Sequence, residues 1–137
     1  MATKTAVNNE KAPDFSAFFN WGLKLTDFSE LFLLAGHGAL GTDFQARHPG
    51  DPAAQTRYIL EDVESFLEKN GYTKHDIIRV EFTMTKDVEP AAYEEIFGIF
   101  AEFFADVEVK PAAGTLRVIE ALAIPGMLVE YEFWAAK

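Results

Sequence analysis

Apolar positions in the first third of the chain predict two strands. Residues 22–26 alternate between apolar and polar side chains, which is typical of a strand with one buried face. Residues 30–35 (ELFLLA) are apolar almost without interruption over a strand's length, which predicts a strand covered on both faces. Between them, residues 27–29 are typical of a turn, and glycines at 36, 38 and 41 end the second strand.

Two later segments carry helical periodicity. Asp51-Pro52 is typical of a helix start, with Asp as N-cap and Pro in the first turn, and Asn70-Gly71 is typical of the end. A second helix is predicted to begin at Glu89-Pro90. Each helix has an apolar stripe, formed by Ile59, Leu60, Val63, Phe66 and Leu67 in the first and by Tyr93, Ile96, Phe97, Phe100, Phe103 and Phe104 in the second.

Three more strands follow from the pattern in the second half. Residues 78–85 alternate strictly between apolar and polar side chains, which predicts a strand with one buried face. Residues 115–123 and 127–135 are predicted as two strands that form a hairpin through Ile124-Pro125-Gly126.

The predicted order is β-β-α-β-α-β-β, an α+β domain in which two helices lie on one face of a mixed sheet. Because the helices can cover only one face and the other face also carries apolar side chains, we expect a second subunit to cover it. Residues 1–14 are polar and are predicted to form a flexible arm, which leaves 15–137 as a single domain.

Composition narrows the classes of function. The chain has 137 residues, a formal charge of −10 and 13 Phe residues. The excess of carboxylates and the lack of a basic run predict no nucleic-acid partner. No apolar run of about 18 residues occurs, so we expect no membrane span. The absence of cysteine excludes disulfides and thiolate chemistry and fits a cytoplasmic protein.

The three histidines differ in their sequence contexts. His37, His48 and His75 lack the spacing of metal ligands, so no metal site is expected. His48 and His75 lie in polar contexts and are expected to be solvated. His37 lies between two glycines directly after a buried strand, where side chains and backbone groups often line sites. It is either a site residue or a turn histidine without a role.

Charged side chains within the last two predicted strands are the main candidates for chemistry. Arg117 lies in the apolar segment TLRVIEALA. It either pairs with a carboxylate such as Glu120 or Glu130, or holds a substrate carboxylate in its guanidinium fork. Glu130 and Glu132 are two residues apart and share one face of their strand. One of them could act as an acid or base if desolvated, whereas we interpret Glu132 as part of an exposed polar face.

Four segments resemble the YjgF/Rid (reactive intermediate deaminase) family: LFLLAGHG (31–38), AQTRYILE (54–61), GYTKHDIIRVEFTMT (71–85) and LVEYEFWA (128–135). With the element order, the resemblance spans about residues 18–135. It implies a chorismate-mutase-like fold that assembles as a homotrimer, with active sites in the three clefts between subunits. It also implies hydrolysis of enamines and imines, such as 2-aminoacrylate or, in some relatives, 2-aminomuconate, to keto acids and ammonia. No metal or organic cofactor is implied.

The resemblance assigns roles to two residues. In the family, a Glu on the last strand positions the attacking water and corresponds to Glu130. An Arg on the preceding strand grips the substrate carboxylate. Counting back from Glu130 places that position at Thr115, two residues before Arg117 and on the same strand face. A hairpin shortened by two residues would restore the match, and we therefore assign the carboxylate clamp to Arg117.

Three other positions depart from the family's pattern. The family's Ser-Gly pair falls on Ala35-Gly36, its helical Asn near Phe97, and its N-terminal aromatic residue near Phe19 without the hydroxyl. The predicted site is therefore more apolar and suited to a larger acid. Its catalytic residues are Arg117 and Glu130, and its substrate-binding residues are Phe19, Gly36, His37, Phe97 and Thr115.

Two other functions compete with deamination. The altered site positions favour a non-catalytic trimer that binds a small acid or an aromatic metabolite. Ribonuclease activity is an older label of some relatives, and the charge of −10 argues against it.

Overall fold

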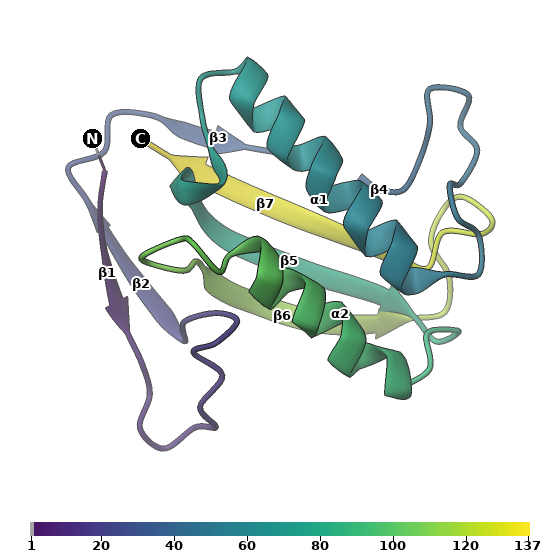
Figure 1. The fold of residues 1–137 in the computed structure, drawn as a ribbon, viewed down its shortest axis with the longest axis horizontal. Helices are drawn as coiled ribbons and strands as arrows, with labels where there is room; N and C mark the ends of the chain where they lie inside the picture. Colours follow the sequence, from purple (N-terminus) through teal and green to yellow (C-terminus); the bar gives the residue numbers. More distant parts are fainter. Residues whose placement is uncertain (1) are drawn as a thin grey trace.

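A computed structural model describes residues Ala2–Lys137 and contains a five-stranded mixed sheet backed by two helices (Figure 1). The strand order is β3 (Leu31–Leu33), β7 (Val129–Ala136), β5 (Ile77–Thr85) and β6 (Ala112–Ile119), and β4 (His37–Gly38) also pairs with β7. β5 and β6 run parallel, whereas β3, β4 and β5 are antiparallel to β7. The predicted α+β class with a mixed sheet is confirmed.

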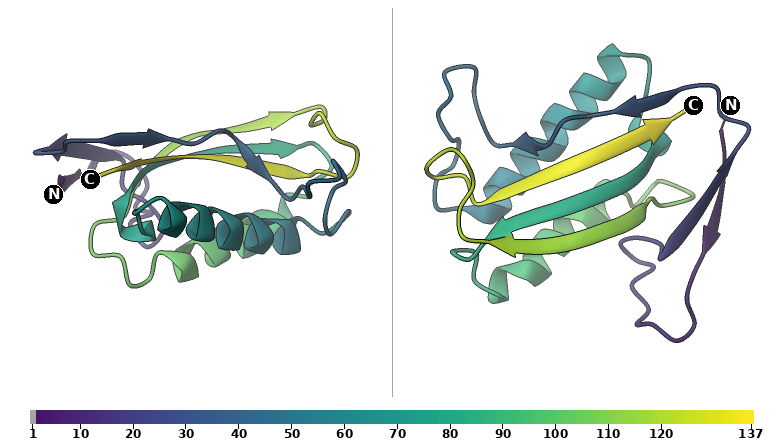
Figure 2. Two further views of the ribbon diagram at one scale, coloured as in Figure 1. Left: turned by 90° about the horizontal axis from the view of Figure 1, so that it is seen from above. Right: turned by 180° about the vertical axis from the view of Figure 1, so that it is seen from behind.

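Both helices lie across the same face of the sheet, as predicted (Figure 2, left). Helix α1 (Pro52–Lys69) begins where the Asp51 carboxylate accepts from the Ala54 amide at 3.0 Å, and α2 (Ala91–Phe103) follows Pro90. The short 3₁₀ helix η1 (Lys74–Asp76) leads from α1 into β5. Within Ala2–Lys137, neither α-helix combines the length and hydropathy that a bilayer span requires.

The N-terminal segment forms structure that the sequence pattern did not predict. Within the expected arm 1–14, β1 (Thr3–Val7) pairs antiparallel with β2 (Gly22–Thr26) in a separate two-stranded sheet. The Lys4 ammonium donates to the Val109 carbonyl at 3.1 Å, and the Asn8 amide donates to Asn20 at 3.0 Å. These polar contacts fix a strand that carries almost no apolar pattern.

The predicted hairpin between the last two strands is wrong. β5 lies between β6 and β7 and pairs with both of them. The last connection therefore crosses the end of β5, and residues 120–123 lie outside β6. Alternation within a strand shows which face is buried, but it does not show which strand lies alongside.

Aromatic side chains fill the space between the sheet and the helices. The ring of Phe82 on β5 lies 5.2 Å from the rings of both Phe19 and Phe100, and the ring of Tyr131 on β7 lies 4.9 Å from that of Phe100. The Phe82 and Tyr131 rings meet Phe100 nearly edge to face, which is a favoured geometry for aromatic pairs. The buried Tyr131 hydroxyl bonds to that of Thr56 on α1 at 2.7 Å, so its polar end is satisfied.

The opposite face of the sheet is open within one chain (Figure 2, right). Leu31 and Leu33 on β3 are 45% and 58% exposed, although the sequence predicted a strand covered on both faces. Leu33 lies opposite the partly buried Trp134 of β7. These side chains form an apolar area at the β3 side of the open face.

A buried amide ties the two loops near the start of α1 together. Gln55 is fully buried, and its Nε2 donates to the carbonyls of Arg47, His48 and Gly126 at 3.1, 3.2 and 2.8 Å. Its Oε1 accepts from the Leu128 amide at 2.8 Å. One side chain therefore satisfies four backbone groups and positions the segment that enters β7.

We expect Gln55→Ala to lower the free energy of unfolding by about 3 kcal/mol, because it opens a cavity and leaves buried backbone groups without partners. Urea unfolding measures the change. The exposed Gln45 in the loop before α1 provides the control, and Gln45→Ala should change stability by less than about 0.5 kcal/mol. Equal stability losses in the two variants would contradict this role of Gln55.

Candidate functional site

Three neighbouring strands bring the two predicted catalytic residues into one row on the open face. Arg117 on β6 lies opposite Thr83 on β5, and Thr83 lies opposite Glu130 on β7. Directly opposed residues of neighbouring strands share a face, so the three side chains lie on the side away from the helices. They line a cavity of about 180 Å³ together with Gly36, Glu81, Tyr131 and Glu132.

Arg117 is held by a carboxylate that the sequence analysis did not identify. Its guanidinium donates to Glu81 Oε2 at 2.6 Å, and the guanidinium of Arg79 donates to Glu81 Oε1 at 2.5 Å. Neither predicted partner is used, since Glu120 pairs with Lys86 at 2.6 Å. The bond from Arg117 lowers the pKa of Glu81, burial opposes this, and Arg79 lowers it further. Glu81 therefore remains ionised and is a poor base.

Glu130 has a different environment. Within Ala2–Lys137, neither an ion pair nor a side-chain hydrogen bond engages its carboxylate. A Cβ at Gly36 would come within 2.9 Å of Glu130 Oε2, so the glycine leaves the space in which this carboxylate lies. Glu130 is only partly buried and borders the cavity. Glu130 and Glu132 are the two carboxylates of this lining that make no ion pair within Ala2–Lys137, and Glu130 is the one in the row with Thr83 and Arg117. Glu130 is therefore placed to bind a water molecule or accept a proton beside Arg117.

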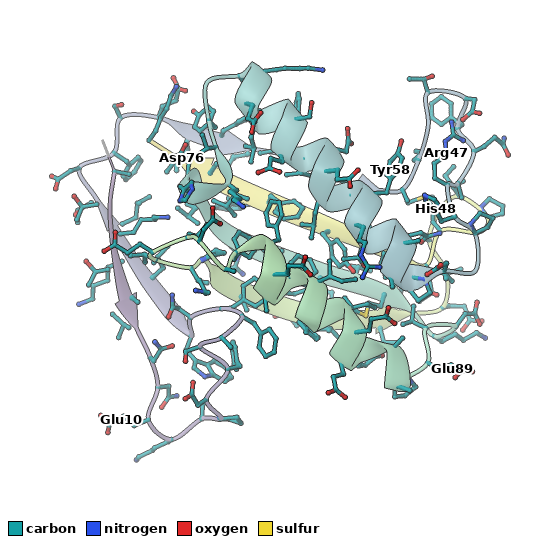
Figure 3. The ribbon with its side chains drawn as sticks, in the orientation of Figure 1. Glu10, Arg47, His48, Tyr58, Asp76 and Glu89 are labelled. Atoms are coloured by element: carbon teal, nitrogen blue, oxygen red, sulfur yellow. The ribbon has the colours of Figure 1, made fainter. Side chains whose placement is uncertain are left out.

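His37 does not join Arg117 and Glu130. It lies opposite Tyr131 on β7, whose side chain points toward the helices, and its ring centroid is 5.8 Å from that of Phe66. Its Nδ1 bonds to the Ala35 carbonyl at 2.7 Å. His48 lies in the loop before α1 beside Tyr58, with 6.3 Å between ring centroids (Figure 3). The structure places both side chains away from the cavity at Arg117.

Two predicted site residues, Phe19 and Phe97, line a separate apolar cavity of about 290 Å³ on the helix side of β6. Its other lining residues are Phe15, Phe18, Phe82, Ala113, Gly114 and Leu116. Gly114 also lies against Glu81, so the apolar cavity and the charged site meet at β6. Thr115 is exposed in the irregular part of β6 between Ala113 and Leu116 and lies outside both linings.

The residues that sequence reasoning missed are Arg79, Glu81 and Thr83. Their alternation with Val80, Phe82 and Met84 did place them on the polar face of one strand. Only the β5–β6 pairing brings Arg117 beside them, and the sequence pattern did not predict which strand lies next to residues 78–85. Among the described residues, no group of three or more His, Asp or Glu side chains is arranged to hold a metal ion.

Comparison with known proteins identifies the family. The family model described as Endoribonuclease L-PSP matches residues 10–137. A RutC family protein from Pyrococcus horikoshii is 30% identical over 136 residues, which cover 98% of each chain. The chain belongs to the YjgF/Rid family.

Solved structures of the YjgF/Rid family have the same fold. A Rid family protein of unknown function from Yersinia pestis superposes with a TM-score of 0.84, at 24% identity and over 98% of each chain. A YjgF family member from Mycobacterium tuberculosis gives a TM-score of 0.63 at 24% identity, over 98% of this chain and all of that one. The predicted family and its two-layer architecture are thus confirmed.

The ion pairs of Glu81 should make a pH-dependent contribution to stability. A carboxylate whose pKa is lowered by folding stabilises the folded state above its ordinary pKa of 4.5, and this contribution is lost as pH falls through the lowered value. We expect the difference in unfolding free energy between wild type and Glu81→Gln to be constant near neutral pH and to shrink below 4.5. Urea unfolding across this range measures it, and a difference that does not vary with pH would contradict the ion-pair assignment.

Proposed function

We propose that this YjgF/Rid protein hydrolyses 2-imino or 2-enamino carboxylic acids of the 2-aminoacrylate or 2-aminomuconate type to 2-keto acids and ammonia. The observation that supports the proposal most is the row of Arg117, Thr83 and Glu130 on one sheet face. Neighbouring strands are about 4.8 Å apart, so β6 and β7 are separated by roughly 10 Å. A small acid and a water molecule fit this span, with the carboxylate toward Arg117 and the imine carbon toward Glu130.

The chemistry requires few groups. In the imine form of the substrate, Glu130 takes a proton from water while the oxygen adds to the carbon of the C=N bond. The nitrogen is protonated, the carbon–nitrogen bond breaks, and ammonia leaves as the carbonyl forms. Water and imine are consumed, and keto acid and ammonia are produced. Glu81 is less suited to be the base, because two guanidinium groups stabilise its ionised form.

The apolar cavity beside β6 supports a larger substrate. Its lining is entirely apolar and includes Phe97, near which the family's helical amide position falls. We propose that it receives the hydrocarbon part of an acid whose carboxylate binds Arg117. Gly114, which lies at both sites, marks where such a molecule would pass the edge of the sheet.

Arg117→Ala should lower kcat/KM for 2-imino acids by at least about a hundredfold, because the substrate carboxylate would no longer be held in place. Ammonia release from freshly generated 2-imino acids and from 2-aminomuconate measures the rate. Arg57→Ala, on the exposed surface of α1, removes an equal charge and should leave the rate unchanged. Unchanged kinetics in Arg117→Ala would remove Arg117 from the site, and the absence of any acceleration over buffer by wild type would refute the deaminase proposal.

A second candidate function is a non-catalytic trimer that binds a small acid or aromatic metabolite. The specific observation in its favour is that Arg117 is already paired with Glu81. A binder without turnover would be stabilised by ligand, by roughly 2.7 kcal/mol at a hundred times its Kd, and would release no ammonia.

We further propose that the chain forms a homotrimer in which the open sheet face is covered by neighbouring subunits. The exposed Leu31 and Leu33 beside Trp134 support this, because large apolar side chains on an open sheet favour subunit contact.

Light scattering coupled to size exclusion should give three times the chain mass of 15.3 kDa. Leu33→Glu should lower this mass, because it places a charge in the apolar contact. The control is Phe44→Glu, which changes an exposed apolar residue in the loop before α1 and should retain the wild-type mass. A wild-type mass equal to that of one chain would contradict the trimer.

A further inference from the structure

The carboxylate clamp proposed for this site is occupied by the chain itself. Arg117 donates to Glu81 Oε2 at 2.6 Å, and this bond is the polar contact that its guanidinium makes within the described chain. The Glu81 side chain is only 15% exposed, whereas that of Arg117 is 55% exposed. A substrate carboxylate that arrives at Arg117 therefore meets a guanidinium that already has a partner. That partner, Glu81, is the less exposed of the two side chains.

The position of the Glu81 side chain depends on the backbone of the neighbouring strand β6. A Cβ at Gly114 on β6 would come within 2.5 Å of the Glu81 carboxyl carbon, so the carboxylate lies in space that only glycine leaves open. The β6 irregularity next to Gly114 places one more residue in β6 than in β5 between the Val80–Ala113 and Phe82–Leu116 pairs. Sheet pairing and the missing side chain together hold Glu81 against β6 and within reach of Arg117.

Arg79 gives Glu81 a second partner. It donates to Glu81 Oε1, which is the oxygen that Arg117 does not use. If Arg117 turns away, Glu81 remains paired and no buried carboxylate is left without a counter-charge, which would otherwise be costly. The replacement of Glu81 by another carboxylate on Arg117 therefore changes the free energy only a little.

We propose that Glu81 is an internal competitor for Arg117, and that a ligand carboxylate binds by displacing Glu81 while Arg79 retains it. This inference rests on the proposed role of Arg117 as a carboxylate clamp. Because displacement replaces one charge-assisted bond by another, a carboxylate alone gains little from binding. An acid that also fills the apolar cavity gains the free energy of hydrophobic contact. Glu81 thus sets the selectivity of the site against small anions and in favour of acids with an apolar part.

The local charge agrees with this role. The open face carries Arg79 and Arg117 with Glu81, Glu130 and Glu132, which leaves a formal charge of −1. Without Glu81 the same group would be neutral and Arg117 would be unpaired. A purely structural Glu81, which holds Arg117 in its binding geometry, predicts the opposite effect on affinity when the carboxylate is removed.

The test is calorimetric binding of phenylpyruvate, a stable 2-keto acid with an aromatic side chain, to wild type and Glu81→Gln. We expect the variant to bind about tenfold more tightly, because a neutral amide competes less well for a guanidinium than a carboxylate does. Binding of 1-phenylpropan-2-one, which lacks the carboxylate, should be the same in both proteins. Glu81→Asp retains the charge but withdraws it by one methylene, so its affinity should lie between the two.

The matched control is Glu95→Gln. Glu95 is exposed on α2 and lies outside the linings of both cavities. The substitution removes the same unit of charge from the protein and should change phenylpyruvate affinity by less than about threefold. An equal gain in Glu95→Gln would show a general charge effect and would overturn the proposal.

The proposal that a ligand displaces Glu81 would also be overturned if Glu81→Gln bound phenylpyruvate no more tightly than wild type does. Undetectable binding of phenylpyruvate to both proteins at millimolar concentration would overturn it as well. Should Glu81→Gln fail to fold, Glu81→Asp decides the matter, and an affinity no higher than that of wild type counts against displacement. The readout does not depend on turnover. Absence of ammonia release would refute the deaminase proposal and leave the exchange intact, whereas absence of a gain in affinity would refute the exchange and leave the deaminase proposal standing.

Discussion

The pairing of β5 with a strand on each side is the constraint on which the core and the candidate site both depend. Alternate residues of β5 point to opposite faces, so Phe82 and Met84 face the helices while Glu81 and Thr83 face the open side. The paired residues of β6 and β7 point to the same two faces, so the partners of Phe82 and Met84 also face the helices and the partners of Glu81 and Thr83 also face the open side. A slip of one residue in either pairing would bury carboxylates under the helices and expose the aromatic core, so packing of the core keeps the charged row in register.

Much of the fold could be predicted from the sequence because its signals are local. The Asp51-Pro52 start, the apolar stripes and the alternation in residues 78–85 depend on residues close in the chain, and the structure contains each of these elements. β1 escaped prediction because polar contacts, such as that of Lys4 with Val109, hold it instead of apolar packing. The hairpin prediction failed because the position of β5 between β6 and β7 is a property of the whole sheet.

In the candidate site, too, residues with a local signal could be predicted, whereas those that depend on strand pairing could not. Arg117 and Glu130 could be selected as candidates from the sequence because charges within apolar strands are conspicuous, and the sheet pairing places them in one row. Glu81 looked like an ordinary polar residue of an alternating strand, and its role depends on Gly114 of a strand that lies parallel to it. His37 was placed at the site by its nearness to Gly36 in the chain, yet neighbouring residues of an extended strand face opposite sides.

The outer position of β6 has a consequence for behaviour in concentrated solution. Beyond the contact of Asn20 with Ala112 and Ala113, the described chain places no strand outside β6, and Val118 is 52% exposed there. An open edge with apolar side chains can recruit a foreign strand. The bulge after Ala113 and the charge of Arg117 are features that discourage such pairing. Arg117, which pairs with Glu81 on the open face, is thus also a charge at an open sheet edge, and we expect its loss to lower colloidal stability.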